Sequence, residues 1–227
     1  MKEGTNTIFF IHPSYAPKHK KVTYAKLVAT MRPLKAEVNR ARVTLGGDQL
    51  DYEGDTSAIP AELQTVKIHL NSVISTPGGR YLNLDIKDFF CGTPMPKKDY
   101  EYAQIHLSLT PEETMQQHEL RKIAANDRVY FEVRKGMPGL KQASIIANKR
   151  LSEHLSKAGY KQSRFTPSLW KHTKLPISFT LVVDDFGVMH KGRKNAQHLI
   201  DTLRSLCTIS IDWTGSKYLG LDMQWDY

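Results

Sequence analysis

The chain has 227 residues, 40% of them hydrophobic and 24% charged, a composition typical of folded globular proteins and unlike that of disordered or fibrous chains. Its 32 Lys and Arg outnumber its 23 Asp and Glu, and the net charge of +9 favours a polyanion such as nucleic acid as partner, although a generically basic protein has the same balance. Two cysteines, no CxxC or HExxH spacing and no apolar run long enough for a signal peptide or membrane span predict an intracellular protein without a structural zinc site.

The first segment, to about residue 55, is basic and strand-like. Lys21 to Met31 and Arg40 to Leu45 are β-rich runs that we expect to pair as antiparallel strands. Arg40 and Arg42 are two residues apart, so a strand would point both guanidinium groups to one face. Such a pair suits phosphate oxygens, but Lys and Arg also protect exposed sheet edges from aggregation, and the pattern alone leaves both interpretations open.

Two helices are predicted in the first half of the chain. The first would be capped by Thr56 or Ser57, and its buried face has three- and four-residue spacing: Ile59, Leu63, Val66, Leu70, Val73 and Ile74. Core packing is a sufficient explanation of this segment. The second begins at Thr110-Pro111-Glu112-Glu113, which has the spacing of a capping box, and we expect a surface helix of about three turns running toward Ala124.

A strand that ends in a carboxylate is predicted after the first helix. Tyr81 to Leu84 is strand-like, Asp85 stands where the strand should end, and Asp88 and the aromatic pair Phe89-Phe90 follow. An Asp in that place is a candidate metal ligand and equally a candidate cap for a following turn.

A cationic loop with two glycines follows a predicted strand over 129–133. Its sequence is Arg134-Lys-Gly-Met-Pro-Gly139-Leu-Lys-Gln142-Ala143. The glycines allow the backbone to approach a phosphate or a base pair closely. The loop lacks the GxxxxGK[ST] order, so it is not a P-loop, and a helix ending at Gly159 is expected after it.

Two adjacent carboxylates stand at the tip of a hairpin predicted late in the chain. The apolar run from Ile177 to Val183 leads into Asp184 and Asp185, and Phe186 to His190 leads out. Two anionic side chains at the end of a buried strand are costly unless a cation meets them, whereas a solvated turn would need none. A helix over 193–206 and strands over 208–213 and 217–225 complete a predicted α+β layer structure.

Asp85, Asp184 and Asp185 lie far apart in sequence and together suit phosphoryl transfer. Two metal ions about 3.5–4 Å apart, held by shared carboxylates, activate an attacking oxygen and stabilise the leaving one. Hard oxygen ligands favour Mg²⁺. We therefore expect Asp184 to face Asp85 across two neighbouring strands.

In their order along the chain, these motifs resemble the reverse transcriptases of copia-type LTR retrotransposons, within the family of right-hand polymerases. The resemblance covers the chain from about Tyr24, and the segments that carry it are Arg40-Ala-Arg42, Leu84-Asp85-Ile-Lys-Asp88-Phe-Phe90, Gly139-Leu-Lys-Gln142-Ala143, Val182-Val-Asp184-Asp185 and Tyr218-Leu219-Gly220. Val182, Pro138 and Ser144 differ from the residues that the family usually has in their places.

The resemblance implies a role for each motif. The catalytic residues would be Asp85, Asp184 and Asp185, and two Mg²⁺ ions, with Mn²⁺ as a substitute, would be bound by Asp85, Asp184 and Ile86. The nucleotide-binding residues would be Arg40, Arg42, Asp88, Phe90, Gly139 and Gln142, with Phe90 as the steric gate that favours deoxynucleotides. The primer grip would be Tyr218, Leu219 and Gly220.

The resemblance also implies a fold of fingers and palm, with an antiparallel palm sheet backed by helices. The fingers would comprise residues 1–60 and 93–141, and the palm residues 61–92 and 142–227, including the primer-grip hairpin. No thumb or RNase H segment is recognised, so a polyprotein neighbour or another subunit would supply them. The implied location is a cytoplasmic particle or the nucleus.

The activity implied by the resemblance is that of an RNA-directed DNA polymerase, a nucleotidyltransferase. Its partners would be an RNA or DNA template-primer and deoxynucleoside triphosphates, held mainly through phosphates and shape. The alternative is a truncated, inactive remnant of a retroelement that binds nucleic acid without extending it.

Overall fold

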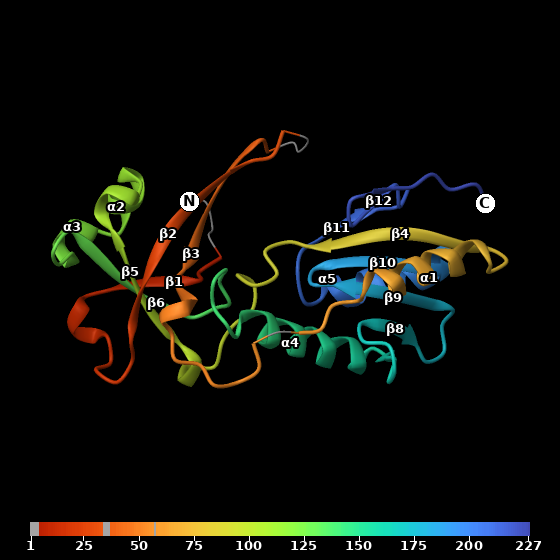
Figure 1. The fold of residues 1–227 in the computed structure, drawn as a ribbon, viewed down its shortest axis with the longest axis horizontal. Coiled ribbons are helices and arrows are strands. Elements are labelled where there is room, and N and C mark those ends of the chain that lie inside the picture. Colours follow the sequence, from red (N-terminus) through yellow and green to blue (C-terminus); the bar gives the residue numbers. More distant parts are fainter. Residues whose placement is uncertain (1–4, 34–36, 57) are drawn as a thin grey trace. The chain divides into compact units, whose positions relative to one another are not determined.

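The computed structural model describes residues 5–33, 37–56 and 58–227. The chain divides into two compact units, each built from two segments: unit 1 comprises residues 1–57 and 90–147, and unit 2 comprises residues 58–89 and 148–227. Both units combine helices with sheets, so the predicted α+β class is confirmed (Figure 1). The assignment of the units to fingers and palm stays a prediction.

Unit 1 is built on a five-stranded sheet in the order β1-β6-β5-β2-β3. Its strands are β1 (Ile8–Ile11), β2 (Val22–Met31), β3 (Asn39–Leu45), β5 (Glu101–His106) and β6 (Arg128–Val133). The β2–β5 pair is parallel and the other pairs are antiparallel. The predicted pairing of the two basic runs is confirmed, because β2 and β3 form one antiparallel hairpin with Arg42 opposite Val28.

The prediction of one continuous surface helix from Pro111 toward Ala124 is wrong. The segment forms two short helices, α2 (Glu112–Gln117) and α3 (Leu120–Ile123), and Pro111, not Thr110, is the N-cap of the first. Glu119 between them has a left-handed backbone with a φ of 48°. This residue redirects the chain so that Leu120, which has no exposed surface, enters the core of unit 1.

Unit 2 is built on a six-stranded, fully antiparallel sheet in the order β11-β4-β10-β9-β8-β7. The strands are β4 (Gly79–Ile86), β7 (Tyr160–Gln162), β8 (Leu169–His172), β9 (Ile177–Val182), β10 (Asp185–Lys191) and β11 (Ile209–Asp212). The helices are α1 (Leu63–Ile74), α4 (Ala143–Lys157), which begins in unit 1, and α5 (Arg193–Arg204).

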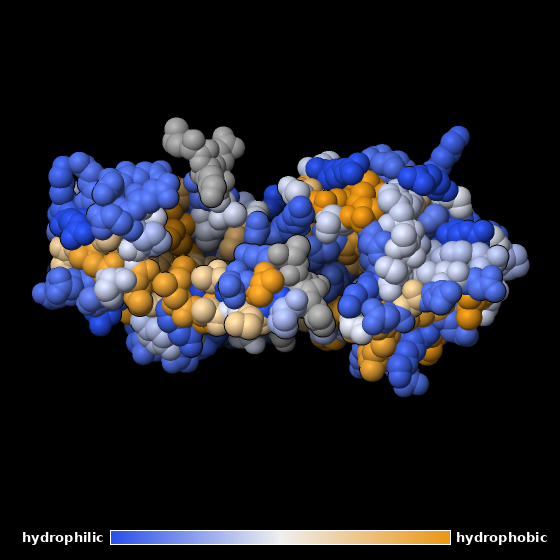
Figure 2. All heavy atoms as spheres, turned by 90° about the horizontal axis from the view of Figure 1, so that it is seen from above, coloured by the Kyte–Doolittle hydropathy of each residue, from blue (hydrophilic) through white to orange (hydrophobic). Residues whose placement is uncertain are grey.

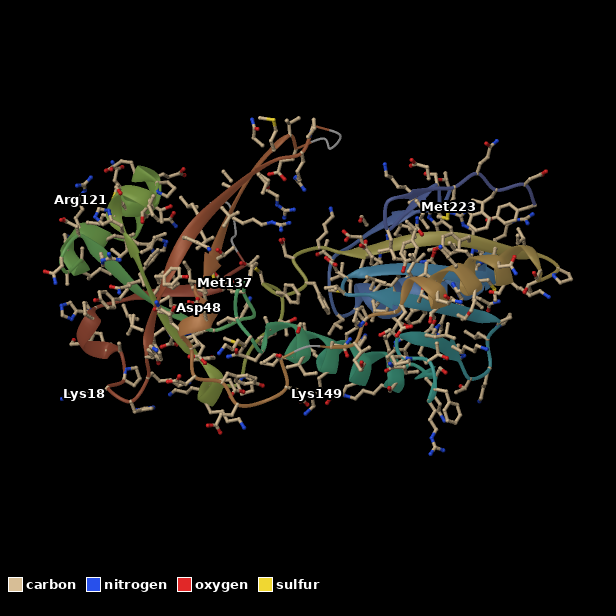
Figure 3. The ribbon with its side chains drawn as sticks, viewed as in Figure 1. Lys18, Asp48, Arg121, Met137, Lys149 and Met223 are labelled. Atoms are coloured by element: carbon tan, nitrogen blue, oxygen red, sulfur yellow. The ribbon has the colours of Figure 1, made fainter. Side chains whose placement is uncertain are left out.

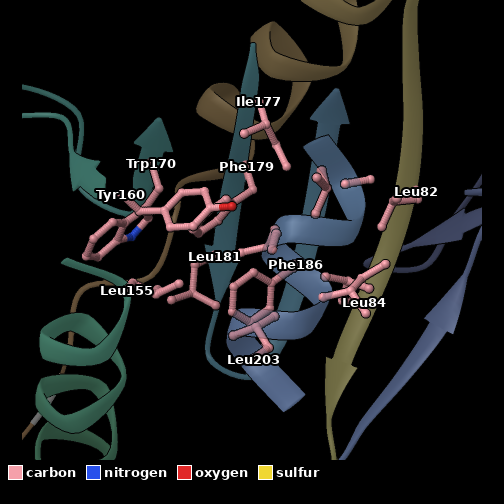
Figure 4. Close-up of a cluster of buried hydrophobic side chains, with 14 of the residues drawn as sticks. Leu82, Leu84, Leu155, Tyr160, Trp170, Ile177, Phe179, Leu181, Phe186 and Leu203 are labelled. Carbon is pink, nitrogen blue, oxygen red and sulfur yellow. The ribbon is translucent and has the colours of Figure 1, made fainter. Parts of the chain in front are cut away.

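The two faces of this sheet carry different cores because side chains alternate along a strand. On one face, Leu82 and Leu84 of β4 and Phe186 of β10 pack with Leu155 of α4 and Leu203 of α5 (Figure 4). On the other face, α1 lies across β4, β10 and β9, and its buried residues pack with two tyrosines: Val66, Val73, Tyr81 and Tyr218. The sheet is therefore covered by helices on both faces.

Helix α1 begins later than predicted. Its first residue is Leu63 and its N-cap is Glu62, and Ile59, expected to be buried, is 64% exposed. The segment before it is extended because the Ala61 N–H donates to the Leu181 carbonyl and Ser168 Oγ donates to the Ile59 carbonyl. Tertiary hydrogen bonds override the helical pattern here. The proposed cap at Ser57 lies outside the described residues.

The strand predicted over 217–225 is also wrong. It is a small hairpin of β12 (Lys217–Tyr218) and β13 (Leu221–Asp222), followed by a tail. The turn residues Leu219 and Gly220 both have positive φ angles, 51° and 82°, as in a type I′ turn.

Hydrophilic residues cover most of the face shown in Figure 2, with hydrophobic patches between them. Among the helices of the described residues, none is long and apolar enough to cross a membrane.

Candidate active site at one end of the unit 2 sheet

The register between β4 and β10 brings together carboxylates that are distant in sequence. The Cα partner of Asp85 on β4 is Asp185 on β10, and the Ile86 N–H donates to the Asp184 carbonyl over 3.1 Å. We expected Asp184 to face Asp85, but Asp185 does so. The reason is that the loop between β9 and β10 has only two residues, so Asp184 lies in the turn itself.

The turn between β9 and β10 has a strained backbone. Val183 is its first central residue and has a φ of 60°, a conformation that a two-residue hairpin of this kind normally fills with Gly. A β-branched residue there costs on the order of 1–3 kcal/mol and persists only where the surroundings impose it. Here the pairing of Val182 with Asp185 and of β10 with β4 imposes it. Strain of this kind is concentrated at functional sites.

Asp85, Asp184 and Asp185 are all half-buried. Asp85 lies between β10 and β11, and Ser210 on β11 is its Cα partner. The Asp85 Oδ2 accepts a hydrogen bond of 3.3 Å from Ser210 Oγ. Asp85 and Asp185 stand on the sheet face opposite the core residues Leu84 and Phe186 because each is one position away along its strand. The carboxylates are thus mounted on a buried scaffold while water can still reach them.

Directly opposed like charges on neighbouring strands repel, and a divalent cation would offset the repulsion between Asp85 and Asp185. The donor atoms that the resemblance implies are all hard oxygens, because the aspartates offer carboxylates and Ile86, with its apolar side chain, offers only its backbone oxygen. Within the described parts of the chain, no three or more His, Cys, Asp or Glu side chains are arranged as a metal site. Mg²⁺ commonly takes only one or two carboxylates and completes its shell with water and substrate phosphates, so the aspartates fit that ion.

The predicted primer-grip residues differ in exposure. Tyr218 is 3% exposed, and its hydroxyl lies 3.5 Å from the Asp185 carbonyl oxygen in the turn between β9 and β10 (residues 182–185, the aspartate turn). Burial raises the pKa of this hydroxyl to about 12. Leu219 is 38% exposed, and a Cβ on Gly220 would meet no atom within 4 Å. Contact with a primer by Leu219 and Gly220 stays a prediction, whereas the burial of Tyr218 makes that residue an anchor of the hairpin.

Gly187 and Asn83 support the site and were missed from the sequence. A Cβ on Gly187 would lie 2.3 Å from Tyr81 Oη and 2.7 Å from the Tyr218 ring, so this position needs a glycine. Asn83 Nδ2 donates to the Lys217 carbonyl over 2.5 Å, which holds β12 against β4. The only sequence signal for either was its place two residues from an aspartate on the same strand face.

The predicted nucleotide-binding arginines lie on β3 of unit 1. Arg40 and Arg42 point to one face of the β2–β3 hairpin, as their spacing predicts. Arg42 is exposed, whereas the Arg40 Nε lies 3.9 Å from a carboxylate oxygen of Glu37. The positive charge is therefore less compensated at Arg42 than at Arg40.

Gly139 and Gln142 have structural contacts in unit 1. Gly139 has a φ of 96°, and a Cβ there would lie 2.1 Å from the Leu45 carbonyl oxygen at the end of β3. Gln142 is 1% exposed and donates from Nε2 to the buried carboxylate of Glu101 over 3.2 Å. Figure 3 labels Met137, which precedes Gly139 in this loop. The sequence gives no sign that Glu101 would be buried, so the partner of Gln142 was not foreseen.

Asp88 and Phe90 follow β4 and lie on either side of the division between the units. Asp88 belongs to unit 2, is exposed and has a φ of 50°. Phe90 belongs to unit 1, where it is partly buried against the core. Each unit thus brings its own candidate residues together: unit 2 the aspartates, unit 1 the arginines and the Gly139 loop.

Comparisons of the chain with models of known protein families and with curated protein sequences find no match.

Proposed function

We propose that the chain is an RNA-directed DNA polymerase domain of the copia type, which transfers nucleotides from deoxynucleoside triphosphates to a primer 3′-hydroxyl. The observation that carries the proposal is the β4–β10 register. It places Asp185 opposite Asp85, with Asp184 in the adjoining turn and bonded through its carbonyl to Ile86.

In the proposed reaction, Asp85, Asp184 and the backbone oxygen of Ile86 would hold two Mg²⁺ ions, or Mn²⁺ in their place. When bound, these ions supply activation of the attacking hydroxyl and charge compensation for the triphosphate. The chain's own residues hold the carboxylates on a rigid sheet and keep them half-exposed to the solvent from which substrates arrive. Rigid mounting matters because a displacement of about 1 Å can cost 100-fold in rate.

Support for a nucleic-acid substrate comes from charge. The chain has a net charge of +9, and one face of the β2–β3 hairpin presents Arg40 and Arg42 beside Lys26 on the neighbouring strand. These side chains can neutralise phosphates of a nucleotide or of a template-primer.

Primer extension tests the proposal. Wild-type protein, a primed RNA or DNA template, and deoxynucleotides with Mg²⁺ or Mn²⁺ should give incorporation that Asp184→Asn lowers by at least about 100-fold. Asp201→Asn is the matched control, because Asp201 is an exposed carboxylate on α5 outside the site. Incorporation by the wild type that does not exceed that of Asp184→Asn, across templates and salt concentrations, would contradict the proposal.

A second candidate function is binding of nucleic acid without extension. Two observations in unit 1 favour it: Glu37 lies beside Arg40, and the Gln142 amide, which the resemblance assigns to nucleotide binding, donates to the buried Glu101 carboxylate. This candidate predicts salt-dependent binding, measured by fluorescence anisotropy, that Asp184→Asn leaves unchanged and that Arg40→Ala with Arg42→Ala weakens. Extension by the wild type rejects it.

A further inference from the structure

A buried hydroxyl lies directly beneath the aspartate turn. The Tyr218 Oη is 3.2 Å from Thr180 Oγ1 and 3.2 Å from the Thr180 carbonyl oxygen on β9, and 3.5 Å from the Asp185 carbonyl oxygen, where β10 begins. A tyrosine hydroxyl donates one hydrogen and accepts others. It can therefore accept from Thr180 Oγ1 while donating to a carbonyl oxygen, and it contacts both strands that enter the turn.

The Tyr218 ring is buried and packs against β4 and β10. It packs in a T-shaped arrangement on Tyr81, with ring centroids 6.2 Å apart, and it fills the space that the missing Cβ of Gly187 leaves. The neighbouring residue Lys217 is fixed through its carbonyl by Asn83. The hydroxyl is consequently presented to the turn from a rigid support.

Packing alone does not account for this hydroxyl. A phenylalanine would fill the same space, and burial of a hydroxyl is costly unless hydrogen bonds compensate it. A tyrosine hydroxyl keeps its proton near neutral pH, and burial raises the pKa of Tyr218 further, to about 12, so the hydroxyl remains a donor. The aspartate turn contains Val183, whose strained backbone conformation persists only while the flanking strands constrain it.

We infer that Tyr218 is a positioning residue, whose hydroxyl fixes the backbone of the 182–185 turn and thereby the carboxylates of Asp184 and Asp185. The inference assigns to Tyr218 a role within the interior of unit 2, in place of direct contact with a primer. Its consequence for catalysis rests on the proposed polymerase function, whereas its consequence for the turn does not.

Tyr218→Phe tests the inference, because it deletes the hydroxyl and keeps the ring. The matched control is Tyr160→Phe, which deletes another buried hydroxyl, bonded to His198 Nδ1 over 3.0 Å among residues of the opposite sheet face. Amide hydrogen exchange of the labelled full chain reports on the turn directly, since the Ile86 N–H is bonded to the Asp184 carbonyl. Primer extension with the same proteins separates kcat from KM.

We expect Tyr218→Phe to speed exchange at Ile86 about tenfold and to lower kcat about tenfold with KM for the deoxynucleotide unchanged. Tyr160→Phe should lower thermal stability about as much as Tyr218→Phe does. It should leave the exchange rate at Ile86 and kcat at the wild-type level. If Tyr218→Phe does not fold, Thr180→Val removes the other hydroxyl of the pair and should shift both readouts in the same direction.

Unchanged exchange at Ile86 in Tyr218→Phe would overturn the inference, as would faster exchange with an unchanged kcat. A wild-type chain that extends no primer would reject the polymerase proposal instead. In that case the exchange rates of Tyr218→Phe and Tyr160→Phe still decide whether Tyr218 fixes the turn.

Discussion

The two units hold their candidate residues in contrasting ways. In unit 2, three half-buried aspartates stand at the end of a sheet whose opposite face is an apolar core, and the buried Tyr218 hydroxyl lies 3.5 Å from the Asp185 carbonyl oxygen. In unit 1, the arginines stand on a hairpin whose other face is partly open to solvent, since Leu27 and Met31 on that face are 42% and 76% exposed. Rigid mounting suits chemistry, and side chains on an exposed ribbon suit adaptable electrostatic contact.

The largest effect is expected for Asp85→Asn in unit 2. We expect kcat for primer extension to fall about 100-fold or more, because the variant loses a carboxylate that is proposed to bind the metal ions. Thermal stability should rise slightly or stay constant, since the charge opposite Asp185 is removed. Steady-state extension and thermal unfolding of the same preparation measure both values. A kcat equal to that of the Asp201→Asn control would remove Asp85 from the site.

Gly187→Ala should disturb the support of the aspartates. Its Cβ would collide with Tyr81 and Tyr218, and we expect a loss of about 3 kcal/mol in the free energy of unfolding, at the upper end of the cost of overpacking. Gly220→Ala is the comparison, because its Cβ enters open space and only its positive φ is penalised, at about 1 kcal/mol. Urea unfolding measures both, and equal losses would mean that Tyr218 moves aside freely.

Acid should destabilise unit 2 through His69. This histidine is 5% exposed on α1, bonded to Ser178 Oγ over 3.0 Å, and burial lowers its pKa from 6.5 to about 4. The unfolded chain therefore binds the proton first, and stability that is present above pH 6.5 is lost as the pH falls toward 4. Between pH 7.5 and pH 5 the loss should be about 2 kcal/mol.

His69→Gln isolates the contribution of His69 from that of His190, whose pKa burial also lowers. Urea unfolding at the two pH values should show a smaller loss in the variant by about 2 kcal/mol. Glu101 in unit 1 has the opposite pH dependence. Burial raises the pKa of its carboxyl group, so its contribution to the free energy of unfolding decreases as the pH rises. An identical pH dependence in wild type and variant would mean that His69 is not buried as described.

The smallest effect is expected for single arginine variants of unit 1. Arg42→Ala should weaken binding of a template-primer and reduce the slope of log K against log salt concentration by about 1, the value for one phosphate contact. Arg40→Ala should reduce it less, because Glu37 already offsets that charge. Anisotropy titrations at several salt concentrations measure the slopes. A larger change of slope for Arg40→Ala than for Arg42→Ala would mean that Arg40, not Arg42, carries the less compensated charge.

Local patterns predicted much of the secondary structure. Alternating apolar residues indicated the hairpin over 177–191 and the basic hairpin of β2 and β3, and both are present. The start of α1 could not be found in this way, because the Ala61 N–H bonds to the distant Leu181 carbonyl. The break at Glu119 likewise follows from the need to bury Leu120. Interactions between distant segments decide such positions.

The aspartates could be selected from the sequence, but their pairing could not. Whether Asp184 or Asp185 lies opposite Asp85 depends on a turn of two residues, and a shift of one residue exchanges the faces of a strand. The burial of Gln142 against Glu101 and of Tyr218 beneath the turn also depends on neighbours far along the chain. Motifs select candidate residues, and tertiary packing determines what each one contacts.

The strained backbone at Val183 has a consequence for heat. A segment that carries on the order of 1–3 kcal/mol of conformational cost opens locally at a lower temperature than the sheet that surrounds it. Alignment of the aspartates should therefore be lost on warming before the core of unit 2 melts. If the chain extends primers as proposed, the temperature of maximal primer extension should lie several degrees below the midpoint of global unfolding.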